Sequence, residues 1–238
     1  MARYVVRLVG SIVIALSVCL GAVAQDSTPT AAQPERIAVV SFLVQVDSNS
    51  VNQLLRVVTD QMRQGTKKIV VIISSPGGDT ASAFAAYNVL RHLPIELTTF
   101  NVGNIDSAAM LLYCAGTHRY SLPKTRFLIH GNSLTFGVGV PMDSTFLDAQ
   151  LEQLKNLNQI VIQVVSATAH KKDAEVEKAV HSQEILGPEE AKEWGLVQDI
   201  RKDFMEPGAV MVSVNATVSP ESKMPVQFSS ITATATAP

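Results

Sequence analysis

The sequence predicts an α/β fold with a mainly parallel sheet, and three observations lead to it. The run Ile69-Val70-Val71-Ile72-Ile73 is β-branched and apolar at every position, which is typical of a strand buried on both faces. Segments with helical spacing of apolar residues alternate with such runs along the chain. Repeated alternation of this kind is built from right-handed crossovers and gives layered α/β folds.

The elements are expected in the following order. The first strand covers the apolar run 37–44, and the first helix covers 50–63 with Ser48 or Ser50 as its N-cap. Pro94 ends the second helix, and Gly195 closes the last one. The remaining predicted elements are a strand at 69–73, a helix at 81–92, a strand at 97–102, a helix at 107–115, a strand at 126–130, helices at 143–169, 173–181 and 189–194, and a strand at 196–200.

The N-terminal segment 1–24 has the pattern of a secretory signal peptide. Two arginines precede an apolar stretch over 8–23, and the segment ends with Ala22-Val23-Ala24. We therefore expect cleavage after Ala24 and an exported protein, periplasmic or secreted. An uncleaved membrane anchor is the alternative, because the apolar stretch is only slightly shorter than a bilayer span. A lipoprotein cysteine at Cys19 is a third interpretation, which the bulky residue before it disfavours.

The rest of the chain divides into a leader, one folded domain and a tail. Residues 25–35 are rich in Thr, Ala, Gln and Pro and are expected to form a flexible leader. The folded domain is expected at 36–203, and the low-complexity segment 204–238 is expected to be disordered. Removal of the signal peptide leaves Cys114 as the single cysteine, in an apolar run that favours a small buried hydrophobe.

Composition and charge exclude several functions. The formal net charge is −2, which gives no basic footprint for nucleic acid. No cofactor is expected, and nothing resembles a phosphate-binding loop that an ATPase would need. No metal site is expected either, because the histidines show no i, i+4 pairing and there is no Cys-x-x-Cys.

Three segments together carry the parts that acyl transfer needs. Ser107 stands among small residues in the run 103–110, after the turn Ser75-Pro76-Gly77-Gly78 and before His130 at the end of an apolar strand. A serine hydroxyl needs a base to accept its proton, and a tetrahedral intermediate needs donors for its oxyanion. The order of these segments points to a serine hydrolase.

The same segments resemble the Clp protease proteolytic subunit family, over roughly residues 36–200. The resemblance implies a crotonase-like spiral of ββα units in a single domain. It also implies a serine endopeptidase that assembles as stacked rings. The motifs that carry it are Ile72 to Gly78, 103–112, Ala115-Gly116 with Arg119, Leu122-Pro123, Phe127 to Gly131, and Pro188 to Val197.

The resemblance assigns roles position by position. It implies Ser107 as nucleophile, His130 as general base, and the backbone N–H groups of Gly78 and Ala108 as the oxyanion hole. For substrate binding it implies Gly77, Gly137 and Gly139, the last two in the stretch that leads to the long helix.

Two residues depart from the family pattern. Where the family has the aspartate of the triad, the ungapped closing segment places Gln183, and the adjacent Glu184 is the substitute. A gap would instead bring in Asp173, Glu175 or Glu177. Asp106 precedes the serine, where the family has a small apolar residue; it is expected to cap the following helix rather than to perturb the nucleophile.

The sequence thus predicts an endopeptidase that cleaves peptides or unfolded protein outside the cytoplasm, as a homo-oligomeric ring. Any ATPase partner would be a separate chain, and an exported protein has no ATP supply. Two alternatives stay open. One is a degenerate crotonase-like homologue that binds a peptide or an acyl ligand. The other is a membrane-tethered Ser–Lys peptidase with a base from Lys171-Lys172.

Overall fold

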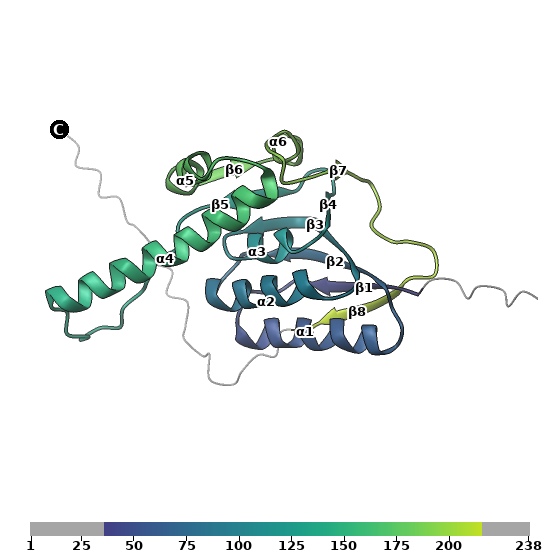
Figure 1. Ribbon diagram of the computed structural model, residues 1–238, viewed down its shortest axis with the longest axis horizontal. Coiled ribbons are helices and arrows are strands. Elements are labelled where there is room, and N and C mark those ends of the chain that lie inside the picture. The colour runs from purple at the N-terminus through teal and green to yellow at the C-terminus, as the bar shows by residue number, and fades with distance from the viewer. Residues whose placement is uncertain (1–35, 216–238) are drawn as a thin grey trace, which may run out of the picture. The chain divides into compact units, whose positions relative to one another are not determined.

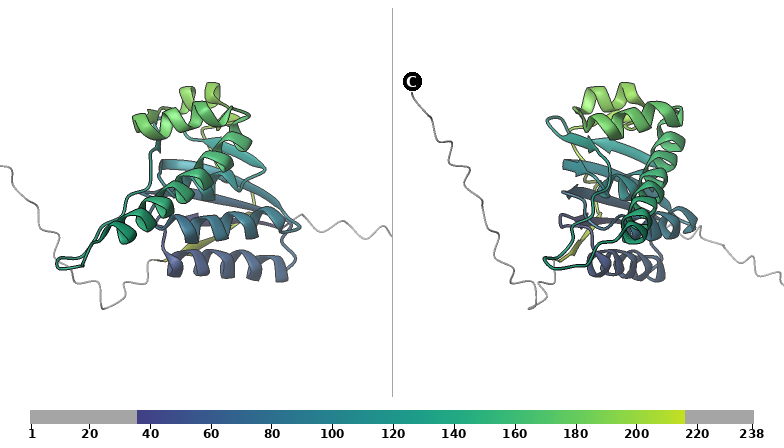
Figure 2. Two further views of the ribbon diagram at one scale, coloured as in Figure 1. Left: turned by 60° about the vertical axis from the view of Figure 1, so that its left-hand side comes forward. Right: turned by 90° about the vertical axis from the view of Figure 1, so that its left-hand side faces the viewer.

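The computed structural model, which describes residues 36–215, is built on an eight-stranded sheet with helices α1 to α4 on one face (Figures 1 and 2). The strand order is β6-β5-β3-β2-β1-β8, with β4 paired to β3 and β7. All pairs are parallel except β5 with β6. The strands are β1 Ile37–Phe42, β2 Lys68–Ser75, β3 Glu96–Asp106, β4 His118–Ser121, β5 Arg126–Ile129, β6 Glu184–Leu186, β7 Asp199–Ile200 and β8 Val210–Val214.

Six helices connect these strands, and the predicted single α/β domain is confirmed. The helices are α1 Ser48–Arg63, α2 Thr80–His92, α3 Ala109–Cys114, α4 Ser144–Ala169, α5 Asp173–Ser182 and α6 Pro188–Trp194. The N-cap of α1 is neither of the two predicted serines. Asp47 caps the helix, and Ser50 completes a capping box by accepting a hydrogen bond from the Asp47 N–H.

Successive side chains of β1 and β2 point to opposite faces of the sheet, so the core has two layers. Val40 and Val71 belong to the large cluster under helices α1 to α4, whereas Val39 and Val70 face the other side of the sheet. On that second side, Phe204 packs edge to face against Phe100, with ring centroids 6.0 Å apart. Both faces of the central strands are therefore covered, as their continuous apolar sequences predict.

The predicted boundary at residue 203 is wrong, because the chain continues as an ordered part of the sheet. Strand β8 pairs with β1 from Ala38↔Val210 to Phe42↔Val214. Five residues, four of them apolar, are enough to add a strand to an open parallel edge. So short a run does not change the average composition of the segment 204–238, which is why the composition did not predict it. The signal peptide and leader predicted for 1–35, and the tail from 216 onward, lie outside the described residues.

Several short elements differ from the prediction. Strand β3 continues to Asp106, whereas the apolar pattern ends at Val102. Strands β4 and β6 were not predicted, because four and three residues carry no readable alternation. The last predicted strand, 196–200, is reduced to Asp199–Ile200.

Helix α4 has two different halves. Its C-terminal half is packed into the core through residues such as Val161, Val165 and Ala169. Its N-terminal half, with the loop before it, extends beyond the sheet (Figures 1 and 2). Between residues 36 and 215, no helix combines the length and hydropathy needed to cross a bilayer.

Candidate active site

Ser107 lies on a sharp turn between strand β3 and helix α3. Its φ is 56°, in the left-handed region, which costs an L-residue with a side chain about 1–2 kcal/mol. The Ser107 N–H donates to the Leu128 carbonyl of β5, 3.0 Å away, and this bond holds the turn against the sheet. The helix predicted from Ser107 begins only at Ala109, so the serine precedes it. Strained strand-to-helix turns of this kind present a nucleophile above a sheet.

The glycine turn after β2 lies directly against Ser107. Gly77 has φ 83°, and a methyl group placed on it would lie 2.5 Å from the Asp106 carbonyl oxygen and 2.7 Å from the Ser107 Cβ. The same methyl group would lie 2.9 Å from the Ala108 nitrogen. Only glycine permits so close an approach. Two motifs that are about 30 residues apart in the chain therefore meet at the serine.

Two backbone N–H groups beside the serine are available as donors. Gly78 has φ 144°, and hydrogen bonds from the residues on either side of it hold it in place. The Gly77 carbonyl accepts from the Val46 N–H, and the Asp79 N–H donates to the Val46 carbonyl, both at 2.8 Å. Within residues 36–215, neither the Gly78 N–H nor the Ala108 N–H donates a hydrogen bond. These are the two groups that the sequence predicts for an oxyanion hole.

His130 follows strand β5, which is the parallel neighbour of β3. The register pairs Ile105 with Phe127 and Asp106 with Leu128, so Ser107 and His130 emerge at the same edge of the sheet. The His130 Nδ1 is 2.7 Å from the Gly131 carbonyl oxygen. Because a carbonyl can only accept, this contact requires a proton on Nδ1, and in the neutral ring Nε2 then carries the lone pair that a general base needs.

The backbone also brings Gln183 beside the histidine, but no hydrogen bond joins the two side chains in the part of the chain that the structure describes. Strand β6 pairs antiparallel with β5 at Ile129↔Glu184, so the next residues along the two strands are His130 and Gln183. Gln183 is the exposed C-cap of α5, with φ 55°. Among the described residues, neither Gln183 nor Glu184 hydrogen-bonds the imidazole, whose partner is the Gly131 carbonyl.

Two of the acidic residues that a sequence gap would bring in, Glu175 and Glu177, have other partners. Glu175 accepts from the Lys172 N–H and lies 3.6 Å from the Lys171 amine, and both groups hold its pKa below the usual range. Glu177 lies 3.9 Å from the His181 ring. The Gly131 carbonyl was not foreseen, and no sequence signal could have found it, because every residue carries the same group.

Comparison with known proteins shows the family of the chain. The family model of the Clp protease matches residues 24–203. The chain belongs to the Clp protease family. Curated members are 28–31% identical to it: the ATP-dependent Clp protease proteolytic subunit 2 of Frankia casuarinae is 28% identical over 167 residues, which cover 69% of this chain and 75% of that protein.

Two further members of the Clp protease family are similarly related. The ATP-dependent Clp protease proteolytic subunit 2 of Mycobacterium leprae is 30% identical over 160 residues, covering 66% of this chain and 74% of the relative. The proteolytic subunit 3 of Nocardia farcinica is 31% identical over 162 residues, covering 66% and 72%. The matched region holds the serine, histidine and glycine segments described above.

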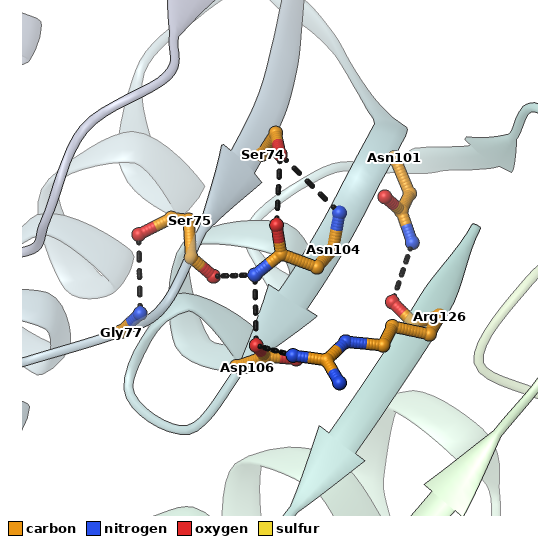
Figure 3. Close-up of polar contacts among 7 residues, drawn as sticks. All are labelled: Ser74, Ser75, Gly77, Asn101, Asn104, Asp106 and Arg126. Carbon is orange, nitrogen blue, oxygen red and sulfur yellow. Dashed lines mark hydrogen bonds and ion pairs between the residues drawn. The ribbon is translucent and has the colours of Figure 1, made fainter.

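Asp106 does not have the capping role predicted for this unusual position in the Clp protease family. Helix α3 has no side-chain cap. Instead, the Asp106 Oδ2 accepts from the Arg126 guanidinium at 2.7 Å and from the Asn104 amide at 2.8 Å (Figure 3). The strand extends to Asp106 itself, which turns its carboxylate toward β5 and away from the helix.

The remaining predicted substrate residues lie in the loop between β5 and α4. Gly137 and Gly139 are exposed there, and Gly139 has φ 84° at a turn. The structure leaves open space around Gly139. Their substrate role stays a prediction.

Two other candidates are accounted for. The Lys171 amine lies 5.2 Å from the Trp194 ring centroid and 3.6 Å from Glu175. These contacts hold it beyond the C-terminal end of α4. Cys114 is buried, as predicted, and burial raises the pKa of its thiol to about 11. In the part of the chain that the structure describes, no three His, Cys, Asp or Glu side chains gather as metal ligands.

Proposed function

We propose that this chain is a serine endopeptidase that hydrolyses peptides or unfolded protein, with Ser107 as nucleophile and His130 as general base. The observation that carries the proposal is the contact of Gly77 with Ser107. The N–H groups of Gly78 and Ala108, the residues that follow Gly77 and Ser107, donate no hydrogen bond within residues 36–215, which supports an oxyanion hole there. Family membership supports the same chemistry.

The proposed reaction uses each group once in acylation and once in deacylation. The His130 Nε2 takes the proton from the Ser107 Oγ as the oxygen attacks the peptide carbonyl carbon. The N–H groups of Gly78 and Ala108 donate to the oxyanion of the tetrahedral intermediate. The imidazolium then gives its proton to the leaving amine, and a water molecule repeats both steps on the acyl-enzyme.

The Gly131 carbonyl takes the orienting part of the third triad residue in this proposal. In Ser-His-Asp enzymes, replacing the aspartate by asparagine costs about four orders of magnitude in kcat, chiefly because the histidine takes the wrong tautomer. A carbonyl acceptor keeps the right tautomer but carries no charge to stabilise the imidazolium. We therefore expect an active enzyme that acylates more slowly than one with a carboxylate.

Active-site labelling with a fluorophosphonate tests the proposal. We expect covalent modification of Ser107 alone, located by mass spectrometry, and none in Ser107→Ala. Ser133→Ala is the matched control, since this serine is exposed on the loop after His130 and its loss should leave labelling intact. Folded protein that does not label would contradict the proposed peptidase activity. It would favour the second candidate function, a homologue that binds peptide without cleaving it, which the uncharged hydrogen-bond partner of His130 supports.

We also propose that the chain assembles into a homo-oligomeric ring. Large apolar side chains are exposed along the loop before α4 and on its projecting half, where a monomer would leave them in water. We expect the wild type to be an oligomer by light scattering at micromolar concentration. The double variant Leu147→Lys/Leu151→Lys should weaken the assembly, and the control Gln153→Lys should leave it unchanged. A monomeric wild type would contradict the ring. The exposed residues are Phe136, Val138, Val140, Met142, Leu147 and Leu151.

The final part of the proposal concerns location and energy supply. The pattern of segment 1–24 supports export, periplasmic or secreted. The relatives named above are proteolytic subunits of ATP-dependent proteases, whereas an exported protein has no ATP supply. We propose that this chain cleaves peptides and unfolded segments without an ATPase partner.

A further inference from the structure

We propose that Asp106 and Arg126 form a clamp that positions the nucleophile against the general base and balances the charge beside them. This inference rests on the proposed function, because it concerns how Ser107 and His130 are held. The ion pair between Asp106 and Arg126 is called the Asp106–Arg126 clamp below. It lies outside the roles that the family resemblance assigns.

The clamp joins the two strands that end in the reacting residues. Asp106 is the last residue of β3, directly before Ser107, and Arg126 is the first residue of β5, which leads to His130. The register places Asn104 opposite Arg126, so Asp106 and Arg126 form a diagonal pair across the two strands. Their 2.7 Å contact therefore links the strand of the nucleophile to the strand of the base.

The clamp also reaches the glycine turn through Asn104. The Asn104 amide nitrogen donates to the Asp106 carboxylate at 2.8 Å and to the Ser75 carbonyl at 2.9 Å (Figure 3). The Ser74 hydroxyl donates to the Asn104 side-chain oxygen at 2.9 Å, and the Gly77 N–H donates to the Ser75 hydroxyl at 3.2 Å. One amide thus ties the residue before the nucleophile to the segment that supplies the oxyanion donor.

The Asp106 carboxylate is buried, and one of its two oxygens has no hydrogen-bond partner among residues 36–215. The side chain is 7% exposed, and that oxygen is Oδ1. A buried carboxylate with one unsatisfied oxygen is costly, and an apolar residue of similar size would avoid that cost. The Arg126 side chain is half-exposed, so the pair keeps one charge at the surface and one beneath Ser107.

The two charges should act on the histidine with opposite signs. Among residues 36–215, Arg126 is the one charged group that hydrogen-bonds Asp106, and Asn104 is its other polar partner. On the other side of β5, the antiparallel strand β6 brings Glu184 opposite Ile129, one residue before His130, and this carboxyl is the same in every variant. Removing the carboxylate charge leaves an unbalanced cation that disfavours the imidazolium of His130. Removing the guanidinium leaves an unbalanced anion that favours it.

The test compares Asp106→Asn, Arg126→Gln and the double variant in the full chain. For peptide hydrolysis, we expect each single variant to lower kcat about tenfold or more, with KM within about twofold, because the reacting groups are misplaced and substrate contacts are not. The acid limb of the kcat/KM profile should move by about half a pH unit, to lower pH in Asp106→Asn and to higher pH in Arg126→Gln. The double variant should return the acid limb toward the wild-type position.

A surface ion pair supplies the matched control. Arg63 and Asp60 of α1 are 2.9 Å apart and exposed, so Arg63→Gln removes an ion pair of the same type away from the site. We expect no change in kcat or in the profile for this variant. Circular dichroism checks that each variant is folded. If Asp106→Asn does not fold, Arg126→Gln still tests the clamp, because it changes a half-exposed side chain.

The possible failures can be distinguished. The clamp alone would be overturned if the wild type is active but the acid limb of the kcat/KM profile stays fixed in both single variants. An acid limb that moves in the same direction in both single variants would also overturn it. Loss of thermal stability with unchanged kcat would do the same, because it would show a purely structural ion pair. Wild-type protein that neither labels at Ser107 nor hydrolyses peptides would overturn the proposed function, and the clamp with it.

Discussion

Replacing His130 by alanine is expected to lower kcat for peptide hydrolysis by about four to six orders of magnitude. The Ser107 hydroxyl then has no base, since the imidazole nitrogen that faces away from Gly131 is the group proposed to accept its proton. The same variant should lose fluorophosphonate labelling while keeping its circular dichroism spectrum, because the ring is only partly buried. Ser107→Ala, measured in the same peptide-hydrolysis assay, gives the background rate.

Gln183→Ala is the companion variant. Gln183 is adjacent to His130 along the paired strands but makes no hydrogen bond to it, so kcat should fall less than about tenfold. A loss as large as that of His130→Ala would show that Gln183 orients the histidine after all. The role proposed for the Gly131 carbonyl would then be wrong.

Gly77→Ala is expected to be strongly damaging although Gly77 supplies no reacting side chain. The added methyl group meets backbone atoms of Asp106 and Ala108 and the Ser107 Cβ at 2.5–2.9 Å, and none of these is the end of a flexible side chain. Overpacking and the positive φ together should lower the free energy of unfolding by about 2–4 kcal/mol. A displacement of Ser107 by about 1 Å would also cost about 100-fold in activity.

Gly65→Ala separates the two causes. Gly65 has a similar φ of 88°, but open space surrounds the position where a methyl group would be added. It should lose only the conformational part, about 1 kcal/mol, and keep full labelling. Urea denaturation and fluorophosphonate labelling measure both variants. Equal effects of the two substitutions would show that the contact between Gly77 and Ser107 is not tight.

The part of the site that sequence could predict is the part built from special residue types. Gly77 and Gly78 are needed because backbone approaches backbone there, and Ser107 and His130 carry chemistry that other residues cannot supply. Such requirements leave a mark in the sequence whatever the neighbouring side chains are. The α/β alternation is equally legible, because buried parallel strands need apolar residues on both faces.

The rest depends on geometry that composition does not record. The Gly131 carbonyl is a group present in every residue, so only the structure shows that it faces the imidazole. The pairing of Asp106 with Arg126 depends on a strand that continues four residues past its apolar pattern. Strand β8 escaped prediction for a related reason: its five residues gain their stability from β1, not from any property of their own.

The parallel pairing of β8 with β1 decides from which edge of the sheet each described end of the chain departs. Val214 of β8 pairs with Phe42, at the carboxyl edge where β2, β3 and β5 deliver Gly77, Ser107 and His130. The chain enters β1 at the opposite, amino edge. A fusion partner joined behind Asn215 would thus start at the edge that carries the candidate site, whereas one joined ahead of Arg36 would start at the opposite edge of the sheet.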